Sequence, residues 1–347
     1  MTQKDFWRSS RIAVMGGGSF GTVLANLAAK NCREVLLYVR DETQARAINS
    51  TRSNPKHSSK LILHENVHAL SSLERVFSRA EGGVQAVIWC LPSRACRTQA
   101  RLMAPYFNGD EIVIHTTKGI EEGTLKRISE VLREELPVSR IGVLSGPNLS
   151  EEIANGDPAA TVIASRFSEV VEAGVALFAS PRFRVYGASD IVGVEWAGTL
   201  KNILAIASGA LDAMELGWNA RAMLITRGLA EMVRFGLAMG AKEATFLGLA
   251  GVGDLLATCM SPLSRNYRVG HRLALGEKLE TILSDLNATA EGVWTTASVR
   301  EFAAQRKIYM PITEGVYQLV IEGKTSAEIM NTVLGRAPTD HALRIDS

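Results

Sequence analysis

A lysine stands alone among apolar residues in the second half of the chain, where it could do acid/base chemistry. Lys201 is the only basic residue in the stretch 191–211, which is long, mostly apolar and helical in composition. Burial disfavours the charged form of a lysine, so a buried Lys201 would be a usable acid or base near neutral pH. Asn202 beside it could bind a hydroxyl or carbonyl oxygen. The alternative is a lysine that reaches solvent from the edge of a helix.

Charged and polar residues also occur in two turns that follow Lys201 in the sequence, each at a predicted helix start. Asp254 follows the glycine turn 251–253 and precedes an apolar stretch. It is either a carboxylate that stabilises a helix N-terminus or a group that orients an ammonium or a substrate hydroxyl. The second turn contains Ser264, Arg265 and Asn266. Its serine predicts a helix N-cap, whereas its arginine and asparagine at an exposed helix start suit a phosphomonoester.

A glycine-rich turn near the N-terminus has the pattern of a nucleotide-binding loop. The apolar run 12–15 predicts a strand buried on both faces of a parallel sheet. Gly16, Gly18 and Gly21 follow it as G-x-G-x-x-G before a helical stretch. In such a loop the glycines make the tight turn, admit a pyrophosphate to the backbone and let the helix pack on the strand. This context predicts dinucleotide binding, against the alternative of a turn that merely closes a βα unit.

The residues after the second predicted strand bear on the choice of cofactor. Arg40 and Asp41 end the apolar run 34–39, about twenty residues beyond the glycine loop. An acidic residue in this position binds the ribose 2′-hydroxyl of NAD, whereas an arginine accommodates the 2′-phosphate of NADP. Because Arg40 comes first, we expect NADP to be preferred and NAD to be tolerated. The alternative for Arg40 is an ordinary solvated arginine at a strand end.

Apolar runs that alternate with helical stretches indicate the fold of the first half. Six of them predict strands: 12–15, 34–39, 67–70, 84–90, 111–115 and 141–144. The alternation predicts an α/β fold, with a Rossmann-like, doubly wound sheet over residues 1–189. Ligands of such sheets bind beyond the carboxyl ends of the strands. The residues expected to converge there are the glycine loop, Arg40, Pro92, Lys118 and Gly146.

Strand-like runs disappear from about residue 190, where long patterns rich in alanine, leucine and methionine begin. They predict a second, all-helical domain over residues 190–338. Its expected helices span 191–214, 220–239, 265–275, 297–305, 314–322 and 326–334. Residues 339–347 are expected to form a frayed tail.

Composition excludes several classes of function. The chain has 347 residues with 46% hydrophobic and 21% charged content, as in an ordinary globular protein, and its net charge of +2 gives no electrostatic case for nucleic acid or an anionic membrane. Residues 1–10 have no apolar core of a secretory signal. The stretch 191–214 is interrupted by Glu195, Lys201 and Asp212, so we expect a buried helix and no membrane span. Four cysteines without C-x-x-C spacing indicate free thiols in a reducing compartment, the cytoplasm.

One motif points to a metal but lacks the context that it needs. His64 to His68 reads H-E-x-x-H, which on a helix would place two zinc ligands on one face. Here the motif follows a polar loop and runs into a predicted strand and a helix cap at 71–72. We therefore expect surface histidines and no metal site.

Together these residues resemble the bacterial NAD(P)-dependent glycerol-3-phosphate dehydrogenases over nearly the whole chain. The order and spacing of the matching blocks fit as well as their content. The blocks are GGGSFGTVLA from Gly16, TTKGIE from Thr116, SGPNLSEEIA from Ser145, EWAGTLKNILAIASG from Glu195, GLAGVGDLLATC from Gly248, SRN from Ser264 and AEGV from Ala290.

The resemblance implies dihydroxyacetone phosphate and glycerol 3-phosphate as substrates, interconverted at carbon 2 in a homodimer that supplies phospholipid synthesis. By position, Lys201 is similar to the family's proton-transferring lysine and Lys118 to its second active-site lysine, with Asp254 as a third catalytic candidate. Implied substrate positions are Lys118, Gly146, Asn148, Lys201, Asp254, Ser264, Arg265 and Asn266. Cofactor positions are Gly16, Gly18, Ser19, Phe20, Gly21, Arg40, Lys118, Ser150, Arg265, Thr289 and Glu291.

The chain departs from the family's pattern at two points. Residues 54–59 read N-P-K-H-S-S where the family usually continues from Asn-Pro into an aromatic-leucine-proline-glycine turn, which puts cofactor affinity or lid behaviour in doubt. Gly17 replaces the usual alanine, a change that we expect to be harmless.

Two other functions stay open at this point. A β-hydroxyacid or ketopantoate-type reductase would also join a nucleotide domain to a helical domain with a lysine, but it would have no use for a phosphate site at Arg265. From a different class, a catalytically silent NAD(P)H sensor or scaffold would bind the cofactor without turnover.

Overall fold

The computed structural model describes residues 3–286 and 290–334 of the chain. The chain folds into two compact units. Unit 1 contains Met1–Glu121 and Lys126–Glu195, and unit 2 contains Glu122–Leu125 and Trp196–Ser347. Helix α9 (Ile191–Ala213) starts in unit 1 and continues into unit 2.

Unit 1 is built on one sheet of eight strands in the order β3-β2-β1-β4-β5-β6-β7-β8. All neighbours are parallel except β6 and β7, which are antiparallel. The strands are β1 (Arg11–Met15), β2 (Glu34–Tyr38), β3 (Val67–Leu70), β4 (Ala86–Trp89), β5 (Ile112–His115), β6 (Ile141–Ser145), β7 (Ala159–Ser165) and β8 (Phe183–Ala188). The six strands predicted from the sequence are confirmed to within two residues at either end, and β7 and β8 were not predicted.

The two extra strands have weak sequence signals for physical reasons. Strand β7 reads AATVIAS, in which small and polar residues surround three β-branched ones. Strand β8 reads FRVYGA and lies at the sheet edge, where only Phe183 is fully buried. An edge strand has one solvated side and therefore lacks the continuous apolar run of a central strand.

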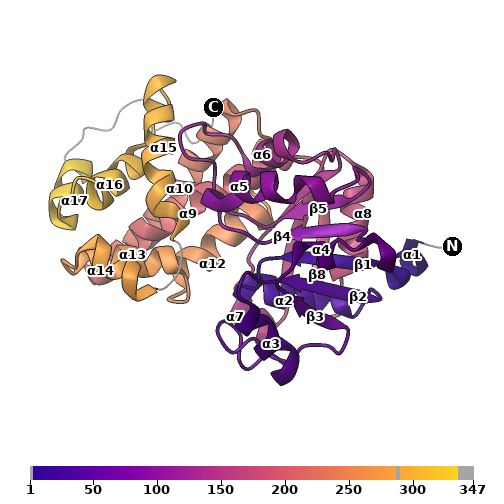
Figure 1. Cartoon of the computed structure of the whole chain (residues 1–347). Helices are drawn as coiled ribbons and strands as arrows, with labels where there is room; N and C mark the ends of the chain where they lie inside the picture. Colours follow the sequence, from indigo (N-terminus) through magenta and orange to yellow (C-terminus); the bar gives the residue numbers. More distant parts are fainter. Residues whose placement is uncertain (1–2, 287–289, 335–347) are drawn as a thin grey trace. The chain divides into compact units, whose positions relative to one another are not determined.

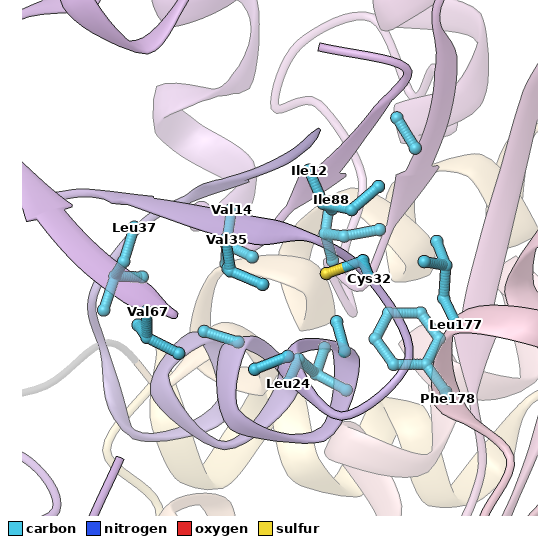
Figure 2. Close-up of a cluster of buried hydrophobic side chains, with 14 of the residues drawn as sticks. Ile12, Val14, Leu24, Cys32, Val35, Leu37, Val67, Ile88, Leu177 and Phe178 are labelled. Atoms are coloured by element: carbon cyan, nitrogen blue, oxygen red, sulfur yellow. The ribbon is translucent and has the colours of Figure 1, made fainter. Parts of the chain in front are cut away.

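Apolar side chains cover both faces of the sheet, because successive residues of a strand point to opposite faces. In β1, Ile12 and Val14 belong to a core with α2, α3 and α8, whereas Ala13 and Met15 belong to a second core with α4, α5 and α6. Figure 2 shows the first core, into which Leu24 projects from α2. The helices of unit 1 are α1 (Gln3–Ser9), α2 (Ser19–Ala29), α3 (Glu42–Thr51), α4 (Leu73–Val76), η1 (Arg79–Glu81), α5 (Ser93–Met103), η2 (Ala104–Tyr106), α6 (Ile128–Glu135), α7 (Ser150–Asn155) and α8 (Ser168–Phe178).

Unit 2 is helical throughout its described residues (Figure 1). After α9 its elements are α10 (Trp218–Ala238), α11 (Glu243–Phe246), the π-helical turn η3 (Leu249–Gly253), α12 (Asp254–Met260), α13 (Arg265–Ala274), α14 (Leu279–Leu286), α15 (Glu291–Gln305), α16 (Pro311–Val320) and α17 (Ser326–Leu334). The sequence did not predict α11 and α14, and it placed the start of α15 six residues too late. The expected tail 339–347 lies outside the described residues.

One described stretch, Glu243–Met260, is long and apolar enough to cross a membrane by length and composition. Length and composition are weak evidence, because the core helices of folded proteins share them. The stretch is not one regular helix here: α11, η3 and α12 follow one another along it, and Asp254 is buried in its second half. Helix α9, which carries the charged residues noted above, is not apolar enough to qualify.

Candidate active site

The glycine loop after β1 has the geometry of a phosphate-binding turn. Gly16 has a φ of +115°, and a Cβ there would lie 2.7 Å from the carbonyl oxygen of Cys90. A Cβ on Gly21 would lie 2.0 Å from the carbonyl oxygen of Gly16, so the first turn of α2 packs directly on the loop. At Gly18 a Cβ would meet nothing within 4 Å, and no side chain caps the start of α2 there. These residues fit a dinucleotide whose pyrophosphate approaches the backbone and the start of α2, where Ser19 and Phe20 lie.

The unusual segment 54–59 lies against this loop. The buried Asn54 donates from Nδ2 to the carbonyl oxygen of Gly17 and to Thr22 Oγ1, both at 2.8 Å. Ser19 Oγ donates to the carbonyl oxygen of His57 at 3.2 Å. The segment is therefore tied to the glycine loop at two points, through Asn54 and through the backbone of His57.

Gly17 packs closely against the residue that follows β2. A methyl group at this position would lie 2.2 Å from Cγ1 of Val39, which is buried beyond the end of β2. The valine therefore occupies the space that an alanine side chain would need. The expectation that glycine is harmless at this position stays a prediction, and the structure adds that alanine could not return here without a shift of Val39.

The end of β2 presents Arg40 and Asp41 differently. Asp41 is the N-cap of α3, and its side chain accepts a hydrogen bond from the backbone N–H of Thr43 at 2.8 Å. Arg40 is exposed. Both residues are exposed, but Oδ1 of the acidic side chain is engaged in capping α3.

Lys118 and Gly146 follow the carboxyl ends of the parallel strands β5 and β6, as predicted. Lys118 Nζ donates to the carbonyl oxygen of Gly146 at 3.2 Å. Asn148 donates from Nδ2 to the carbonyl oxygen of Ala160 at 3.1 Å and accepts from Thr161 Oγ1 at 2.8 Å. Its side chain therefore fastens the segment between β6 and α7 to β7, which is a structural role in addition to the substrate role that the resemblance implies. Ser150 is the first residue of α7.

Lys201 is buried in α9, at 4% exposure, and ion-pairs with Asp254 at the start of α12. Thr258 Oγ1, one turn further along α12, accepts a second hydrogen bond from Lys201 Nζ at 2.5 Å. Thr258 Oγ1 in turn donates to the carbonyl oxygen of Asp254 at 2.7 Å, which fixes its lone pair toward the lysine. The alternative of a lysine that reaches solvent is excluded. The sequence missed Thr258, although its i+4 spacing from Asp254 was a usable signal.

The starts of α13 and α15 adjoin within unit 2. Ser264 caps α13 as predicted, accepting from the backbone N–H of Tyr267 at 3.3 Å. Asn266 Oδ1 accepts from the backbone N–H of Gly292 at 3.1 Å. Desolvation lowers the pKa of Arg265, and the nearby carboxylate of Glu291 partly offsets that shift. Arg265 is exposed at the start of α13, where its guanidinium could contact an anion. Thr289 lies outside the described residues.

Glycines bring these helix starts against α9. A Cβ on Gly270 of α13 would lie 1.8 Å from the carbonyl oxygen of Ile206, and one on Gly209 of α9 would lie 1.9 Å from that of Tyr267. A Cβ on Gly292 would lie 2.6 Å from the carbonyl oxygen of Asn202. Helices α13 and α15 therefore touch α9 backbone to backbone, and α9 is the element that positions the polar groups of unit 2.

The H-E-x-x-H sequence is not on a helix. His64 precedes a turn and His68 lies in β3, while Ser72 caps α4, as predicted. Within residues 3–286 and 290–334, no three histidine, cysteine or acidic side chains gather in a way that could hold a metal ion.

A parallel α/β sheet with a G-x-G-x-x-G loop, joined to a helical unit with a buried lysine–carboxylate pair, defines a nicotinamide-dinucleotide-dependent oxidoreductase. Comparison with known families makes this specific. Residues 11–171 match the N-terminal domain of NAD-dependent glycerol-3-phosphate dehydrogenase, and residues 190–331 match its C-terminal domain. The chain belongs to this family.

Individual relatives agree with the family match. The chain is 45% identical over 332 residues to a glycerol-3-phosphate dehydrogenase [NAD(P)+] of Pseudomonas paraeruginosa, covering 95% of this chain and 96% of the relative. It is 45% identical over 314 residues to that of Acinetobacter baumannii, covering 90% and 86%.

Solved structures show the same fold. A glycerol-3-phosphate dehydrogenase of Coxiella burnetii superposes with a TM-score of 0.88 at 33% identity, covering 94% of this chain and 99% of that one. A PanE/ApbA family ketopantoate reductase from Ralstonia eutropha shares the fold alone, with a TM-score of 0.58 and 18% identity over 90% and 98% of the two chains.

Proposed function

We propose that this chain interconverts dihydroxyacetone phosphate and sn-glycerol 3-phosphate, with Lys201 as the proton donor and acceptor. The single observation that carries the assignment of the proton transfer is the buried contact of Lys201 with Asp254 and Thr258. Family membership supports the pair of substrates and the use of a nicotinamide dinucleotide.

The reaction needs positive charge and a proton at one oxygen atom. Reduction of the ketone turns its carbonyl oxygen into an alkoxide, and a lysine ammonium can stabilise that charge and protonate it. The bound dinucleotide supplies the hydride at carbon 2. Asp254 and Thr258 hold the Lys201 side chain in one rotamer, so little ordering is needed when substrate binds. Lys118 is the second candidate cation, held by the carbonyl oxygen of Gly146.

The substrate's phosphate is assigned to the start of α13. Arg265 offers an exposed guanidinium, and the N–H groups of the first turn add the positive end of the helix dipole. Asn266 uses its carbonyl oxygen on Gly292, which leaves its amide nitrogen to donate to a ligand. Holding the phosphate fixes carbon 2, and such positioning is worth several kcal/mol of barrier, of the order of 7–11 at best.

Replacement of Lys201 with alanine tests the proton transfer. We expect turnover to fall by at least a thousandfold while the dissociation constant for NADPH stays within twofold, because the glycine loop is untouched. Turnover of Lys201→Ala within tenfold of the parent would refute the assignment. A protein that binds NADPH tightly but has no turnover before mutation would be a sensor instead.

The phosphate assignment is tested with a pair of substrates. We expect dihydroxyacetone phosphate to be reduced and dihydroxyacetone to be reduced hardly at all, as followed by the absorbance of the reduced cofactor. Arg265→Ala should narrow the difference in kcat/KM between the two substrates, since it removes a contact that only the phosphorylated substrate can make. Equal turnover of both substrates by the unmodified enzyme would contradict a phosphate site.

NADPH is proposed as the preferred cofactor, with NADH accepted. The support is that Arg40 is exposed at the end of β2 while the Asp41 side chain is engaged in capping α3. A carboxylate in use as a helix cap is a poor partner for a ribose 2′-hydroxyl, whereas an exposed guanidinium suits a 2′-phosphate.

We further propose a cytoplasmic homodimer that supplies glycerol 3-phosphate for phospholipid synthesis. None of the four cysteines forms a disulfide, and burial raises the pKa of Cys32, Cys90 and Cys259 to about 12, so these three thiols are unreactive. Large apolar side chains are exposed on α12 and the turns beside it, including Leu247, Met260 and Leu263. Such side chains suit contact with a second copy. Light scattering at micromolar concentration would measure the mass, and a monomer would contradict the proposal.

A further inference from the structure

A buried carboxylate stands in the first turns of α9, six residues before Lys201. Glu195 Oε1 accepts from the backbone N–H of Ser129 at 2.8 Å, and its Oε2 accepts from Ser129 Oγ and Arg127 Nη1, both at 2.6 Å. His115 Nε2 lies 3.1 Å from Oε1. Burial alone would raise the pKa of Glu195, but the contacts with His115, Arg127 and Ser129 outweigh it and hold the pKa at about 2. The carboxylate is therefore ionised at any working pH.

The partners of Glu195 come from two separate elements of unit 1. His115 is the last residue of β5, three residues before Lys118. Arg127 and Ser129 stand at the start of α6, whose free backbone N–H groups favour an anion. One carboxylate thus fastens the start of α9 to a strand end of the sheet and to a helix N-terminus.

A cluster of this kind is a poor way to gain stability alone. The free energy lost when charges are removed from water is often as large as the free energy gained from their attraction. A protein with well-packed apolar side chains of the same volume in place of the cluster is often equally stable. The charged cluster instead fixes the orientation of the Glu195 side chain, because each carboxylate oxygen accepts hydrogen bonds from donors that are themselves held by α6. These contacts therefore hold the first turns of α9 so that they neither rotate about the helix axis nor slide along it within unit 1.

The rest of α9 carries the chemistry. Lys201 follows Glu195 by six residues, about 9 Å along a continuous helix. Further on, α13 touches the same helix through Gly209 and Gly270. A shift of the first turn of α9 is therefore passed along a stiff element to the buried lysine.

We propose that Glu195 is a positioning residue for this reaction, holding the first turn of α9 on β5 and α6 so that the same helix holds Lys201 where proton transfer requires it. This inference rests on the proposed role of Lys201. Misplacement of a reacting group by about 1 Å can cost roughly a hundredfold in rate.

The test is Glu195→Gln, which keeps the shape but removes the charge and two of the acceptor sites. We expect kcat to fall about 30- to 100-fold, while the dissociation constant for NADPH, measured by fluorescence titration, stays within twofold. Glu195→Asp should recover part of kcat.

The matched control is Glu231→Gln. Glu231 is also a buried carboxylate, and it accepts from the backbone N–H of Thr313 and from Thr313 Oγ1 at the start of α16, but it lies on α10. The Glu231→Gln variant should have a kcat within twofold of the unmodified enzyme at 25 °C. If both variants lose kcat alike, or neither does, Glu195 has a structural role only and the proposal is overturned.

A double mutant separates this inference from the role of Lys201. If Glu195 acts through Lys201, then Glu195→Gln should change the residual turnover of Lys201→Ala by less than twofold. A loss in that background as large as in the parent would refute the inference while leaving the proton donor intact. Full activity of Lys201→Ala would instead refute the proposed function. If Glu195→Gln does not fold, Ser129→Ala removes one of the same hydrogen bonds and is expected to lower kcat by three- to tenfold; an unchanged kcat in that variant would overturn the proposal.

Discussion

Replacement of Gly270 with alanine tests whether the contact of α13 with α9 positions the phosphate site. The new Cβ would lie 1.8 Å from the carbonyl oxygen of Ile206, an atom of the α9 backbone that cannot rotate away. Ordinary contact needs well over 3 Å, so the two helices must separate by about 1.5 Å at this point. The start of α13, with Arg265 and Asn266, would move with its helix.

The size of the effect follows from opposing contributions. Overpacking of this kind costs about 1–3 kcal/mol, and widening the Gly209 contact adds lost dispersion. Replacing glycine with alanine inside a helix returns about 1 kcal/mol. We therefore expect a net loss of about 1–2 kcal/mol, which lowers the melting temperature by about 1–3 °C for a chain of this size. The KM for dihydroxyacetone phosphate should rise at least tenfold, since the phosphate contacts are displaced.

Thermal unfolding, steady-state kinetics and NADPH titration measure the three quantities. NADPH affinity should change less than KM, because the glycine loop 16–21 is in unit 1. The control is Gly217→Ala at the N-cap of α10, where a Cβ meets nothing within 4 Å and the loss should stay below about 1 kcal/mol. A Gly270→Ala enzyme that melts like the Gly217→Ala control and keeps its KM would refute this reasoning.

Three further predictions concern stability and cofactor choice. Burial raises the pKa of Glu231 to about 7, above its ordinary value, so its contribution to stability is fully present below pH 4.5 and is lost as the pH rises through 7. The free energy of unfolding, measured by urea titration at each pH, should therefore fall by about 2–3 kcal/mol between pH 5 and pH 8. Glu231→Gln should make this free energy less dependent on pH. An unchanged pH dependence in the variant would show that Glu231 is not the group responsible. Gly17→Ala should lower the free energy of unfolding by about 1–2 kcal/mol because its methyl group overlaps Val39. The double variant Gly17→Ala/Val39→Ala should lose less stability than the sum of the two single variants. Simple additivity would mean that the two side chains do not compete for the same space. Arg40→Ala should weaken NADPH at least tenfold and NADH less than threefold, and equal losses in fluorescence titrations would leave Arg40 as an ordinary surface residue.

The sequence predicted most of the fold because the central strands are short, unbroken apolar runs with glycine or proline close behind them. Strand β1 and the loop from Gly16 to Gly21 are the clearest case, since Gly16 and Gly21 each have a steric reason that the structure bears out. Strand β8 lacked such a signal because one of its sides is solvated. Helix α14 was missed although Leu279, Ile282, Leu283 and Leu286 have the i, i+3, i+4, i+7 spacing of an amphipathic helix, so a usable signal was present.

The site was harder to predict than the fold, because contacts between distant residues leave no mark in local sequence. Lys201 and Asp254 are 53 positions apart, and only folding shows that they pair. The anchoring of Glu195 to Arg127 and Ser129 is similarly remote. The roles of the substrate and cofactor residues, Thr289 among them, stay predictions.

The backbone contacts at Gly209, Gly270 and Gly292 also limit how this enzyme can be redesigned. A side chain at any of them would meet the backbone of the facing helix, so substitutions there force α13 or α15 away from α9 and disturb the packing. Arg265 has no such constraint, because its side chain faces accessible space at the start of α13. Libraries that aim at substrates with a carboxylate or a sulfate in place of the phosphate should therefore vary Arg265 and keep the three glycines fixed.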